Sequence, residues 1–408
     1  KMKNKKILII SHQFLPYVSP RTTRWNLLID ELIKKGNEVT VLSGTNPENI
    51  DKKYKVLYFG NKQISSSISK VRLNSQKPSN NILKRTIYLS FKKIYRFLFK
   101  TFSWPDYAMF WVLTILKNRE RIENNYDIII SVSLPFTSHL CAYIIHKKIQ
   151  ADWYMDIGDP FSLKIKSPEN NIFIYSYLNK FFERKFYKKA SKIIFTHNEV
   201  AELHQTKFKI DHSKIVIGHP IALVSEENIN ISKNFNYKVK PLKIGYFGAF
   251  TNSVREPINY LNLIANTLNE DIEHVWYINK ESKKYFSSVK NSPYHKFFDI
   301  VPRKDAIEIM VKRIHILLSI GNQNKYQMPS KVIEYLSLGK PVLHFAEIED
   351  DPLYNYEGLF DNLKIIDNKT SKNEIDNYFE NIKENKFKIE LENLENQFSA
   401  SKLINDLI

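Results

Sequence analysis

The alternation of short apolar runs with amphipathic segments constrains the fold of this chain more than any other feature. Residues 6–11 (KILIIS) and 38–43 (EVTVLS) are apolar runs, and the segment 24–36 between them has helical apolar spacing and ends in glycine. This pattern predicts a strand, a helix and a second strand, with Gly36 just beyond the helix C-terminus. It continues through predicted strands at 127–131, 152–157, 192–196 and 214–218, with helices near 137–149 and 170–190. Such alternation is typical of a doubly wound parallel sheet.

The same alternation begins again after residues 225–241, a polar segment without periodicity that we interpret as a linker. Predicted strands follow at 243–250, 274–279, 297–301, 315–320, 341–346 and 363–367, with helices near 257–268, near 304–313 and from Pro329 onward. We therefore expect an α/β protein with two Rossmann-like domains, residues 1–225 and 242–385, facing each other across a cleft. The tail, residues 386–408, is expected to be helical. Ligands of such sheets bind beyond the carboxyl ends of the strands.

Composition narrows the class of protein. Of 408 residues, 43% are hydrophobic and 13% aromatic, which is enough for two cores. Cys141 is the single cysteine, so a disulfide framework and a cysteine-based metal site are excluded, as suits a reducing cytosol. Polar residues follow the first apolar run too soon for a signal peptide, and the apolar runs at 107–116 and 128–145 are too short or too interrupted to span a membrane. We expect a soluble protein without a metal site, and no P-loop or Gly-x-Ser-x-Gly motif is present.

The net charge of +18 is concentrated in one segment. Residues 52–105 contain thirteen lysines and arginines and no acidic residue. Within them, residues 81–102 place apolar and aromatic side chains on one helical face, and Arg85, Lys92, Lys93, Arg96 and Lys100 on the other. This pattern favours an insertion that binds an anionic membrane surface, and hence a cytoplasmic protein peripheral to the inner face of the plasma membrane. Burial of the apolar face within the protein is an alternative. Nucleic acid is not the expected partner, because no recognised binding motif accompanies the charge.

The segment PSKVIEYLSLGKPVL, residues 329–343, predicts a helix that leads into a buried strand. Val332, Tyr335 and Leu336 share one side, and Lys331 and Glu334 are neighbours on another. Backbone amides near Ser330 and Lys331 could bind an anion at the helix N-terminus, and the Lys331 ammonium would add a full charge for a diphosphate. Glu334 could accept hydrogen bonds from ribose hydroxyls. The alternative is an ordinary solvated Lys–Glu pair.

A second candidate phosphate site follows the strand that begins at Lys243. The strand leads into Gly245 and Gly248, and Arg255 precedes a helix that Pro257 opens. Glycine lets a phosphate approach the backbone, and a guanidinium can bind it through two parallel hydrogen bonds. A loop without ligand is the alternative.

Three strand-to-helix junctions of the first half carry further candidates. Residues 11–25 contain Arg21, Thr22 and Thr23, of which either threonine could instead cap the following helix. Residues 152–162 contain Asp156 and Asp159, which could hold sugar hydroxyls or act as a base, or form an Asp-Pro turn. His139 follows the next junction, where a structural hydrogen bond is the alternative role.

Taken together, these segments resemble the GT-B glycosyltransferases of family 4, particularly bacterial enzymes that build cell-surface polysaccharides. The resemblance lies in residues 6–25, 102–111, 155–162, 213–221, 244–250 with Arg255, and 329–343, in the order of the family. It implies a retaining, metal-independent transferase without a cofactor. The C-terminal domain would hold a nucleotide sugar, linked to UDP or GDP, and the N-terminal domain a glycan or lipid-linked acceptor of the cell envelope.

The resemblance also assigns roles to individual residues. Gly248, Arg255, Arg303, Ser330, Lys331 and Glu334 are expected to bind the donor, with Arg255 and Lys331 on the diphosphate and Glu334 on the ribose. Arg21, Thr22, Asp106, His139 and Asp159 are the candidates for acceptor binding or catalysis.

The chain departs from the family pattern at two places. Tyr326 stands where the first glutamate of the family pair would fall, so Gln323 or Gln327 would have to replace its contact with the sugar. Residues 19–22, Ser-Pro-Arg-Thr, stand in place of the usual glycine pair of the first loop. Two other functions stay open on the sequence. One is a GT-B sugar-nucleotide epimerase, and the other is a non-catalytic GT-B protein that binds a membrane or a partner transferase.

Overall fold

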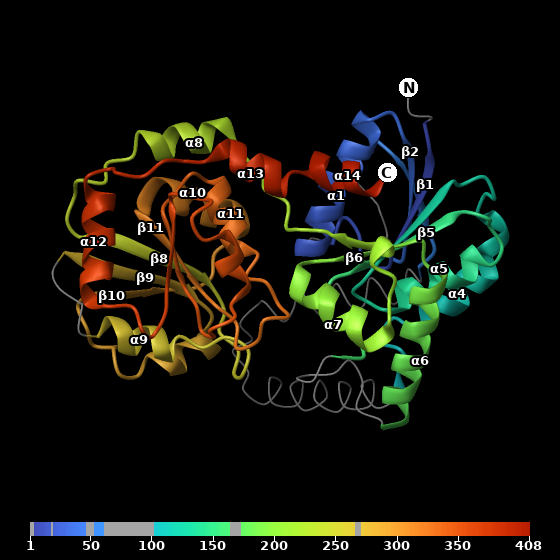
Figure 1. Cartoon of the computed structure of the whole chain (residues 1–408), viewed down its shortest axis with the longest axis horizontal. Helices are drawn as coiled ribbons and strands as arrows, with labels where there is room; N and C mark the ends of the chain where they lie inside the picture. Colours follow the sequence, from blue (N-terminus) through green and yellow to red (C-terminus); the bar gives the residue numbers. More distant parts are fainter. Residues whose placement is uncertain (1–3, 18, 46–52, 61–101, 164–172, 266–270) are drawn as a thin grey trace, which may run out of the picture. The chain divides into compact units, whose positions relative to one another are not determined.

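The computed structural model describes residues 4–17, 19–45, 53–60, 102–163, 173–265 and 271–408. The chain divides into two compact units (Figure 1). The N-terminal unit comprises residues 1–218 together with 403–408, and the C-terminal unit comprises residues 219–402. The last six residues of the chain therefore belong to the unit in which the chain begins.

The N-terminal unit is a seven-stranded parallel sheet with helices around it. Its strands are β1 (Lys6–Ser11), β2 (Glu38–Ser43), β3 (Lys55–Tyr58), β4 (Ile128–Val132), β5 (Asp152–Ile157), β6 (Lys192–Phe195) and β7 (Ile215–Ile217), in the spatial order β3-β2-β1-β4-β5-β6-β7. Its helices are α1 (Pro20–Lys34), α4 (Phe110–Asn118), α5 (Thr137–His146), α6 (Phe173–Lys189), α7 (Asn198–Phe208) and α14 (Ala400–Leu407). The prediction of a doubly wound sheet is confirmed here.

Local sequence explains both ends of the first helix. The Ser19 hydroxyl accepts a hydrogen bond from the Thr22 amide at 3.1 Å, and Pro20 takes the first helical position. The predicted cap at Thr22 or Thr23 is therefore wrong, because Ser19 performs that role one turn earlier. Gly36 adopts a φ of +86° just past the helix end, which confirms its predicted position.

The C-terminal unit is a six-stranded parallel sheet. Its strands are β8 (Leu242–Gly248), β9 (Ile272–Ile278), β10 (His295–Phe298), β11 (Ile316–Ile320), β12 (Val342–Phe345) and β13 (Leu363–Ile366), in the spatial order β10-β9-β8-β11-β12-β13. Its helices are α8 (Glu226–Lys233), α9 (Ile258–Ile264), α10 (Arg303–Arg313), α11 (Lys331–Ser337), α12 (Lys372–Lys383) and α13 (Leu391–Phe398). Both units thus have the repeated α/β order that the sequence predicts.

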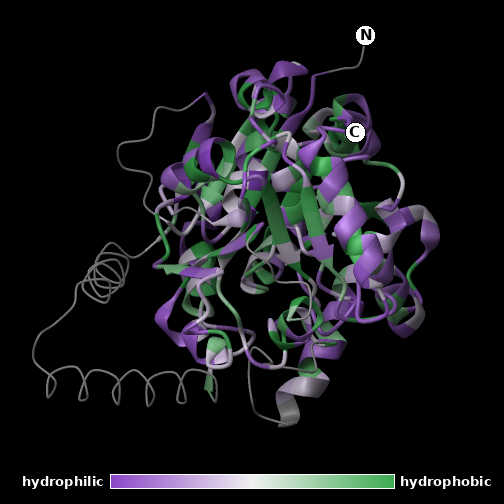
Figure 2. Cartoon of the chain, turned by 90° about the vertical axis from the view of Figure 1, so that its left-hand side faces the viewer, coloured by the Kyte–Doolittle hydropathy of each residue, from purple (hydrophilic) through white to green (hydrophobic). Residues whose placement is uncertain are grey.

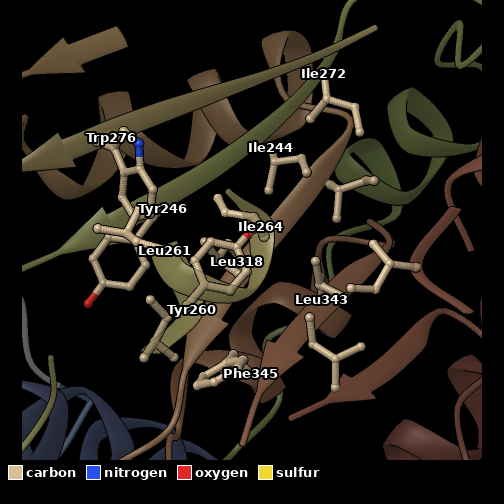
Figure 3. Close-up of a cluster of buried hydrophobic side chains, with 14 of the residues drawn as sticks. Ile244, Tyr246, Tyr260, Leu261, Ile264, Ile272, Trp276, Leu318, Leu343 and Phe345 are labelled. Carbon is tan, nitrogen blue, oxygen red and sulfur yellow. The ribbon is translucent and has the colours of Figure 1, made fainter. Parts of the chain in front are cut away.

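Two hydrophobic clusters fill the C-terminal unit, one containing Ile244 and Tyr246 and the other Phe247. Their separation follows from the alternation of side chains along a strand. Residues of α9 and α12 belong to the first cluster, and residues of α10, α11 and α13 to the second. Figure 3 shows Tyr260, Leu261 and Ile264 of α9 among the strand residues of the first cluster. In Figure 2 the central strands are hydrophobic and the helices around them carry hydrophilic residues.

Three segments differ from the sequence-based predictions. The predicted linker contains helix α8, which buries Ile229 and Ser232 and whose Ser232 hydroxyl donates to the Leu338 carbonyl at 2.7 Å, so contacts with distant residues hold a segment without visible periodicity. The predicted basic insertion begins with strand β3, which pairs with β2. Strand β10 lies at His295–Phe298 rather than at 297–301, since His295 pairs with His274. The tail, by contrast, was expected to be helical and forms helices α13 and α14. Lys192 donates to the Leu407 carbonyl at the end of α14 at 2.8 Å.

No helix in the described part of the chain has the length and apolar character needed to cross a membrane. The residues proposed to bind an anionic membrane, Arg85, Lys92, Lys93, Arg96 and Lys100, lie outside the described residues.

Candidate functional site

Each sheet has one point where the strand order reverses direction. In the C-terminal unit, the chain passes from β8 outward to β9 and β10, and then returns to β11 on the other side of β8. In the N-terminal unit the same reversal lies between β1 and β4. Loops diverge beyond the carboxyl ends of the strands at such a point and leave room for a ligand.

Gly248 and Lys331 meet at the carboxyl end of β8. The Lys331 ammonium donates a hydrogen bond to the Phe247 carbonyl, and a Cβ placed on Gly248 would lie 2.6 Å from the Lys331 Nζ. Glycine at position 248 is thus what allows the ammonium to reach the backbone of the strand end. Burial lowers the pKa of Lys331 to about 8, with a further lowering by Arg255 and a partial offset by Glu334.

Arg255 is held beside the same strand end by the loop that follows β11. Its Nε donates to the Asn322 Oδ1 at 3.1 Å, and the Asn322 amide donates to the Gln327 carbonyl at 2.6 Å. The Gln323 amide donates to the Val254 carbonyl at 2.8 Å, which joins the two loops a second time. In the described part of the chain, neither Arg255 nor Lys331 lies within 4.0 Å of a carboxylate. Two cations therefore converge on one strand end without a paired anion.

Glu334 and Arg303 form an ion pair on the surface of the C-terminal unit. Arg303 Nε and Nη2 donate to Glu334 Oε1 at 3.1 and 2.6 Å, and about half of the Arg303 side chain is exposed. Val332, Tyr335 and Leu336 are buried while Glu334 is not, which confirms the predicted orientation of the helix. The predicted free amide at Ser330 is wrong, because that N–H donates to the Met328 carbonyl at 2.8 Å.

In the N-terminal unit, Arg21 is joined to the end of β5. Its Nη1 lies 3.0 Å from the Asp156 Oδ2, which also accepts from the Trp25 indole N–H. A Cβ on Gly158 would fall 1.8 Å from the Arg21 Nη2, so the guanidinium lies directly over this glycine. Burial lowers the pKa of the neighbouring Arg24 to about 10, and Asp156 partly offsets this. Asp156 is thus a buried carboxylate paired with Arg21 rather than a surface carboxylate.

His139 is fully buried in α5. Its Nδ1 shares a hydrogen bond of 2.7 Å with the Ser131 hydroxyl, and burial lowers its pKa to about 4. The ring is therefore neutral at pH 7 and lies inside the N-terminal unit. This placement favours the structural role that the sequence left open.

The other acceptor candidates are either buried, like His139, or partly exposed, like Arg21. Asp106 is buried, and its Oδ2 accepts from the Thr137 amide at 3.0 Å, so it caps α5 from a distant part of the chain. Thr22 is buried, and its hydroxyl is 2.9 Å from that of Ser19. Asp159 is half-buried just past the end of β5. Of the five candidates, Arg21 and Asp159 retain exposed surface at the carboxyl edge of the sheet.

Sequence reasoning missed several polar residues that follow strands. Asn322 holds Arg255, and Glu347 lies two residues past the end of β12. Both come directly after an apolar strand, so the strand-end rule that selected Gly248 could also have found them. No group of three or more metal-binding side chains occurs among the residues that the structure describes.

Comparisons with known proteins give structural matches only. No family model and no curated protein sequence matches the chain. The solved structures that it resembles include a sucrose-phosphate synthase from Thermosynechococcus elongatus, with 9% identity, a TM-score of 0.63 and coverage of 99% of this chain and 97% of that one. The lipopolysaccharide outer core galactosyltransferase WaaB matches with 13% identity, a TM-score of 0.60 and 98% coverage of both chains. Anabaena HepE in complex with UDP matches with 12% identity, a TM-score of 0.56, and coverage of 99% of this chain and 98% of that one.

At these identities the likeness shows the fold. The two parallel sheets with their surrounding helices form the GT-B architecture, as the sequence predicts. Because one fold serves many reactions, the reaction depends on the residues of the site.

Proposed function

We propose that this chain is a retaining, metal-independent glycosyltransferase of the family 4 type, which moves a sugar from a nucleotide sugar to a glycan or lipid-linked acceptor of the cell envelope. One observation carries the proposal: Lys331 and Arg255 converge beside Gly248 without a carboxylate within 4.0 Å in the described part of the chain. Both side chains are partly buried, where a cation without a nearby anion is costly, and a diphosphate would supply the missing negative charge.

The chemistry of transfer explains why these charges would be placed there. When the bond between the sugar and the diphosphate breaks, negative charge develops on the departing phosphate oxygen. Lys331 and Arg255 would stabilise that charge, because cations fixed in position before the reaction need no reorganisation during it. The second oxygen of Glu334 could accept from ribose hydroxyls while Oε1 stays with Arg303. UDP is the first nucleotide to test, since Anabaena HepE binds it, and GDP is the second.

On the acceptor side, Arg21 and Asp159 are the residues that support the proposal. Both retain exposed surface at the carboxyl edge of the N-terminal sheet, where an acceptor hydroxyl could be oriented. No cofactor is proposed, because the leaving group of the donor supplies the driving force.

Nucleotide binding tests the donor half of the proposal. Thermal unfolding of the native chain is expected to shift upward by a few degrees with one of UDP, GDP, CDP, dTDP and ADP, because a ligand that binds the folded state stabilises it. Glu334→Ala should reduce this shift strongly through loss of the ribose contact. Glu308→Ala, an exposed glutamate that pairs with Lys312, is the matched control and should behave like the native chain. No shift with any nucleotide would contradict the proposal.

Product analysis separates the proposal from its alternatives. A transferase forms a new glycosidic bond, whereas a sugar-nucleotide epimerase forms a new free sugar nucleotide without an acceptor. A non-catalytic GT-B protein forms neither product. The experiment incubates the protein with sugar derivatives of the stabilising nucleotide, with and without a lipid extract as the source of acceptor. Chromatography of the products then distinguishes the three functions.

We also propose that the protein binds the inner face of the plasma membrane from the cytoplasm. Besides the basic segment, large apolar residues of the N-terminal unit are 40–65% exposed: Phe102, Tyr107, Phe110, Leu113, Leu116, Tyr177 and Phe181. Lys185 lies 5.8 Å from the Phe181 ring, so cations and aromatic residues share this surface. Such a combination suits the interface of an anionic bilayer.

Vesicle binding tests the membrane proposal. At low salt the native chain should sediment with vesicles rich in phosphatidylglycerol and not with neutral vesicles. Replacement of Lys92, Lys93 and Arg96 by alanine should weaken binding by at least about tenfold, since each basic residue near an anionic surface contributes about 1 kcal/mol. Replacement of Lys283, Lys284 and Lys290 by alanine removes the same charge from the C-terminal unit and should have little effect. Equal binding by both triple variants would contradict the proposal.

A further inference from the structure

Glu347 lies at the same edge of the C-terminal sheet as the two converging cations. It lies two residues past the end of β12. The loop after β11 runs beside that strand end, because the Gly321 amide donates to the Phe345 carbonyl at 2.8 Å. The next residue of that neighbouring loop, Asn322, is the partner of Arg255. The carboxyl end of β12 thus contacts Gly321, the residue directly before Asn322, and Asn322 positions Arg255, a candidate ligand of the diphosphate.

The Glu347 carboxylate is fixed through one oxygen and unpaired at the other. Asn259 Nδ2 donates to Oε1 at 2.6 Å. Oε2 is buried and has no hydrogen-bond partner among the described residues, where no cation lies within 4.0 Å of the carboxylate either. Burial raises the pKa of Glu347, which the Asn259 hydrogen bond partly offsets. An unsatisfied buried acceptor of this kind costs free energy unless a ligand donates to it.

The loop that carries Glu347 cannot easily move to relieve this cost. His344 lies 3.3 Å from the Asp351 Oδ2 through Nε2, and 3.1 Å from the Ser319 hydroxyl through Nδ1. The other oxygen of Asp351 accepts from the Leu353 amide at 2.9 Å. The segment between His344 and Leu353 is therefore anchored at both ends by buried groups, and the position of Glu347 is fixed before any ligand arrives.

The residue at position 326 makes a carboxylate at this edge significant. Tyr326 occupies the place where a sugar-binding glutamate would be expected, and a tyrosine lacks the two acceptor oxygens of a carboxylate. Its backbone amide is used in a local turn, donating to the Asn324 Oδ1 at 3.1 Å. Glu347 is a carboxylate at the same sheet edge with one acceptor oxygen still available.

We infer that Glu347 binds a hydroxyl group of the donor sugar and thereby helps to select that sugar. The inference rests on the proposed function and adds a specificity-determining residue to it. No cation lies near Oε2 among the described residues. A sugar hydroxyl is a neutral hydrogen-bond donor, so it can satisfy this oxygen without a positive charge. A site that binds a hydroxyl in this way discriminates strongly against sugars that lack it, because the carboxylate would then stay unpaired.

The inference predicts that Glu347 affects sugar recognition and not nucleotide recognition. Titration calorimetry would compare the binding of free UDP with that of UDP-glucose, UDP-galactose and UDP-N-acetylglucosamine. If another nucleotide stabilises the native chain, that nucleotide and its sugar derivatives take their place. For Glu347→Gln and Glu347→Ala, the affinity for the free nucleotide should stay within about twofold of native. The affinity for the preferred nucleotide sugar should fall by about tenfold or more, as for a lost hydrogen bond to a charged group.

Control variants separate recognition from loop damage. Glu349→Gln changes an exposed carboxylate of the same loop, which pairs with Lys369 at 2.6 Å, and should leave both affinities unchanged. Asn259→Ala should also lower the affinity for the nucleotide sugar, but by a smaller factor, because it frees the Glu347 carboxylate without removing it. Unchanged melting temperatures would establish that the variants are folded.

Three results would overturn the inference. Affinity for the nucleotide sugar within twofold of native in Glu347→Ala would show that the carboxylate makes no sugar contact. If a folded Glu347 variant lost affinity for the free nucleotide and for the nucleotide sugar by the same factor, Glu347 would act on nucleotide binding rather than on sugar binding. Absence of nucleotide binding by the native chain would refute the proposed function and this inference together, whereas the first two results refute the inference alone.

Discussion

Replacement of Lys331 by alanine is expected to weaken binding of the preferred nucleoside diphosphate by about 10- to 100-fold, and Arg255→Ala by a similar factor. Each variant removes one charge-assisted hydrogen bond to the diphosphate, and such bonds contribute about 1.5–3 kcal/mol. Transfer of the sugar should fall further than binding, because the departing phosphate carries more negative charge in the transition state than in the bound donor. Calorimetry of nucleotide binding and initial rates of transfer measure the two effects separately.

The pH dependence of binding identifies Lys331 as the group responsible. Burial lowers its pKa to about 8 in the free protein, so the ammonium is charged below that pH and loses its proton as the pH rises through it. A diphosphate binds the charged form more tightly and so raises the pKa in the complex. Affinity should therefore be highest below pH 8 and decline above it, by at most about tenfold per pH unit for one proton. In Lys331→Ala this decline should be absent.

An exposed lysine provides the control for Lys331. Lys304→Ala removes a positive charge from an exposed position of the C-terminal unit and should change affinity by less than about twofold, since surface charges are screened by solvent and salt. If Lys331→Ala and Arg255→Ala both bound and transferred like the native chain, the assignment of the diphosphate site would be refuted.

Replacement of Asp156 by alanine is expected to destabilise the N-terminal unit by about 3–5 kcal/mol, the usual effect of removing one partner of a buried ion pair. The variant would leave the Arg21 guanidinium and the Trp25 indole N–H without their shared acceptor, and would remove the anion that favours the charged form of Arg24. Urea unfolding followed by tryptophan fluorescence measures the change. Trp25, Trp104, Trp111 and Trp153 lie in this unit, so the signal reports mainly on it.

Two further variants test the origin of that loss. Asp152→Ala, on the same strand, removes an exposed carboxylate that accepts from the Ser191 hydroxyl, and should cost less than about 1 kcal/mol. Arg21→Ala combined with Asp156→Ala should cost less than the sum of the single variants, because the two side chains interact directly. A loss below about 1 kcal/mol for Asp156→Ala would contradict the buried ion pair as a stabilising element.

Much of the fold could be predicted because its signals are local. Strand residues such as those of 6–11 and 316–320 are buried on both faces of a parallel sheet, so they form continuous apolar runs that the sequence displays directly. Gly36 was predictable because a positive φ just after a helix favours glycine. Helix α8 and the limits of β10 were not, because they depend on contacts with distant residues, such as the Ser232 hydroxyl with the Leu338 carbonyl and the pairing of His295 with His274.

The candidate site divides along the same line. Lys331 and Glu334 could be assigned to a polar side of their helix because helical spacing alone separates them from Val332, Tyr335 and Leu336. That Glu334 pairs with Arg303, 31 positions earlier, depends on how two helices lie on the sheet. The burial of His139 and Asp106 follows likewise from the packing of α5 against its neighbours, which leaves no trace in the spacing of residues.

Residue type and spacing were enough to predict two doubly wound α/β units and the loops at the carboxyl edges of their sheets, because these signals act within a few positions along the chain. Which side chains of those loops are exposed, paired or unsatisfied depends instead on the folded arrangement. Lys331 reaches the end of β8 over Gly248, Asp156 serves two donors of α1, and Glu347 keeps one oxygen unpaired. These are properties of contacts between segments far apart in sequence, and the free energy of a buried charge depends on such contacts rather than on the residue alone.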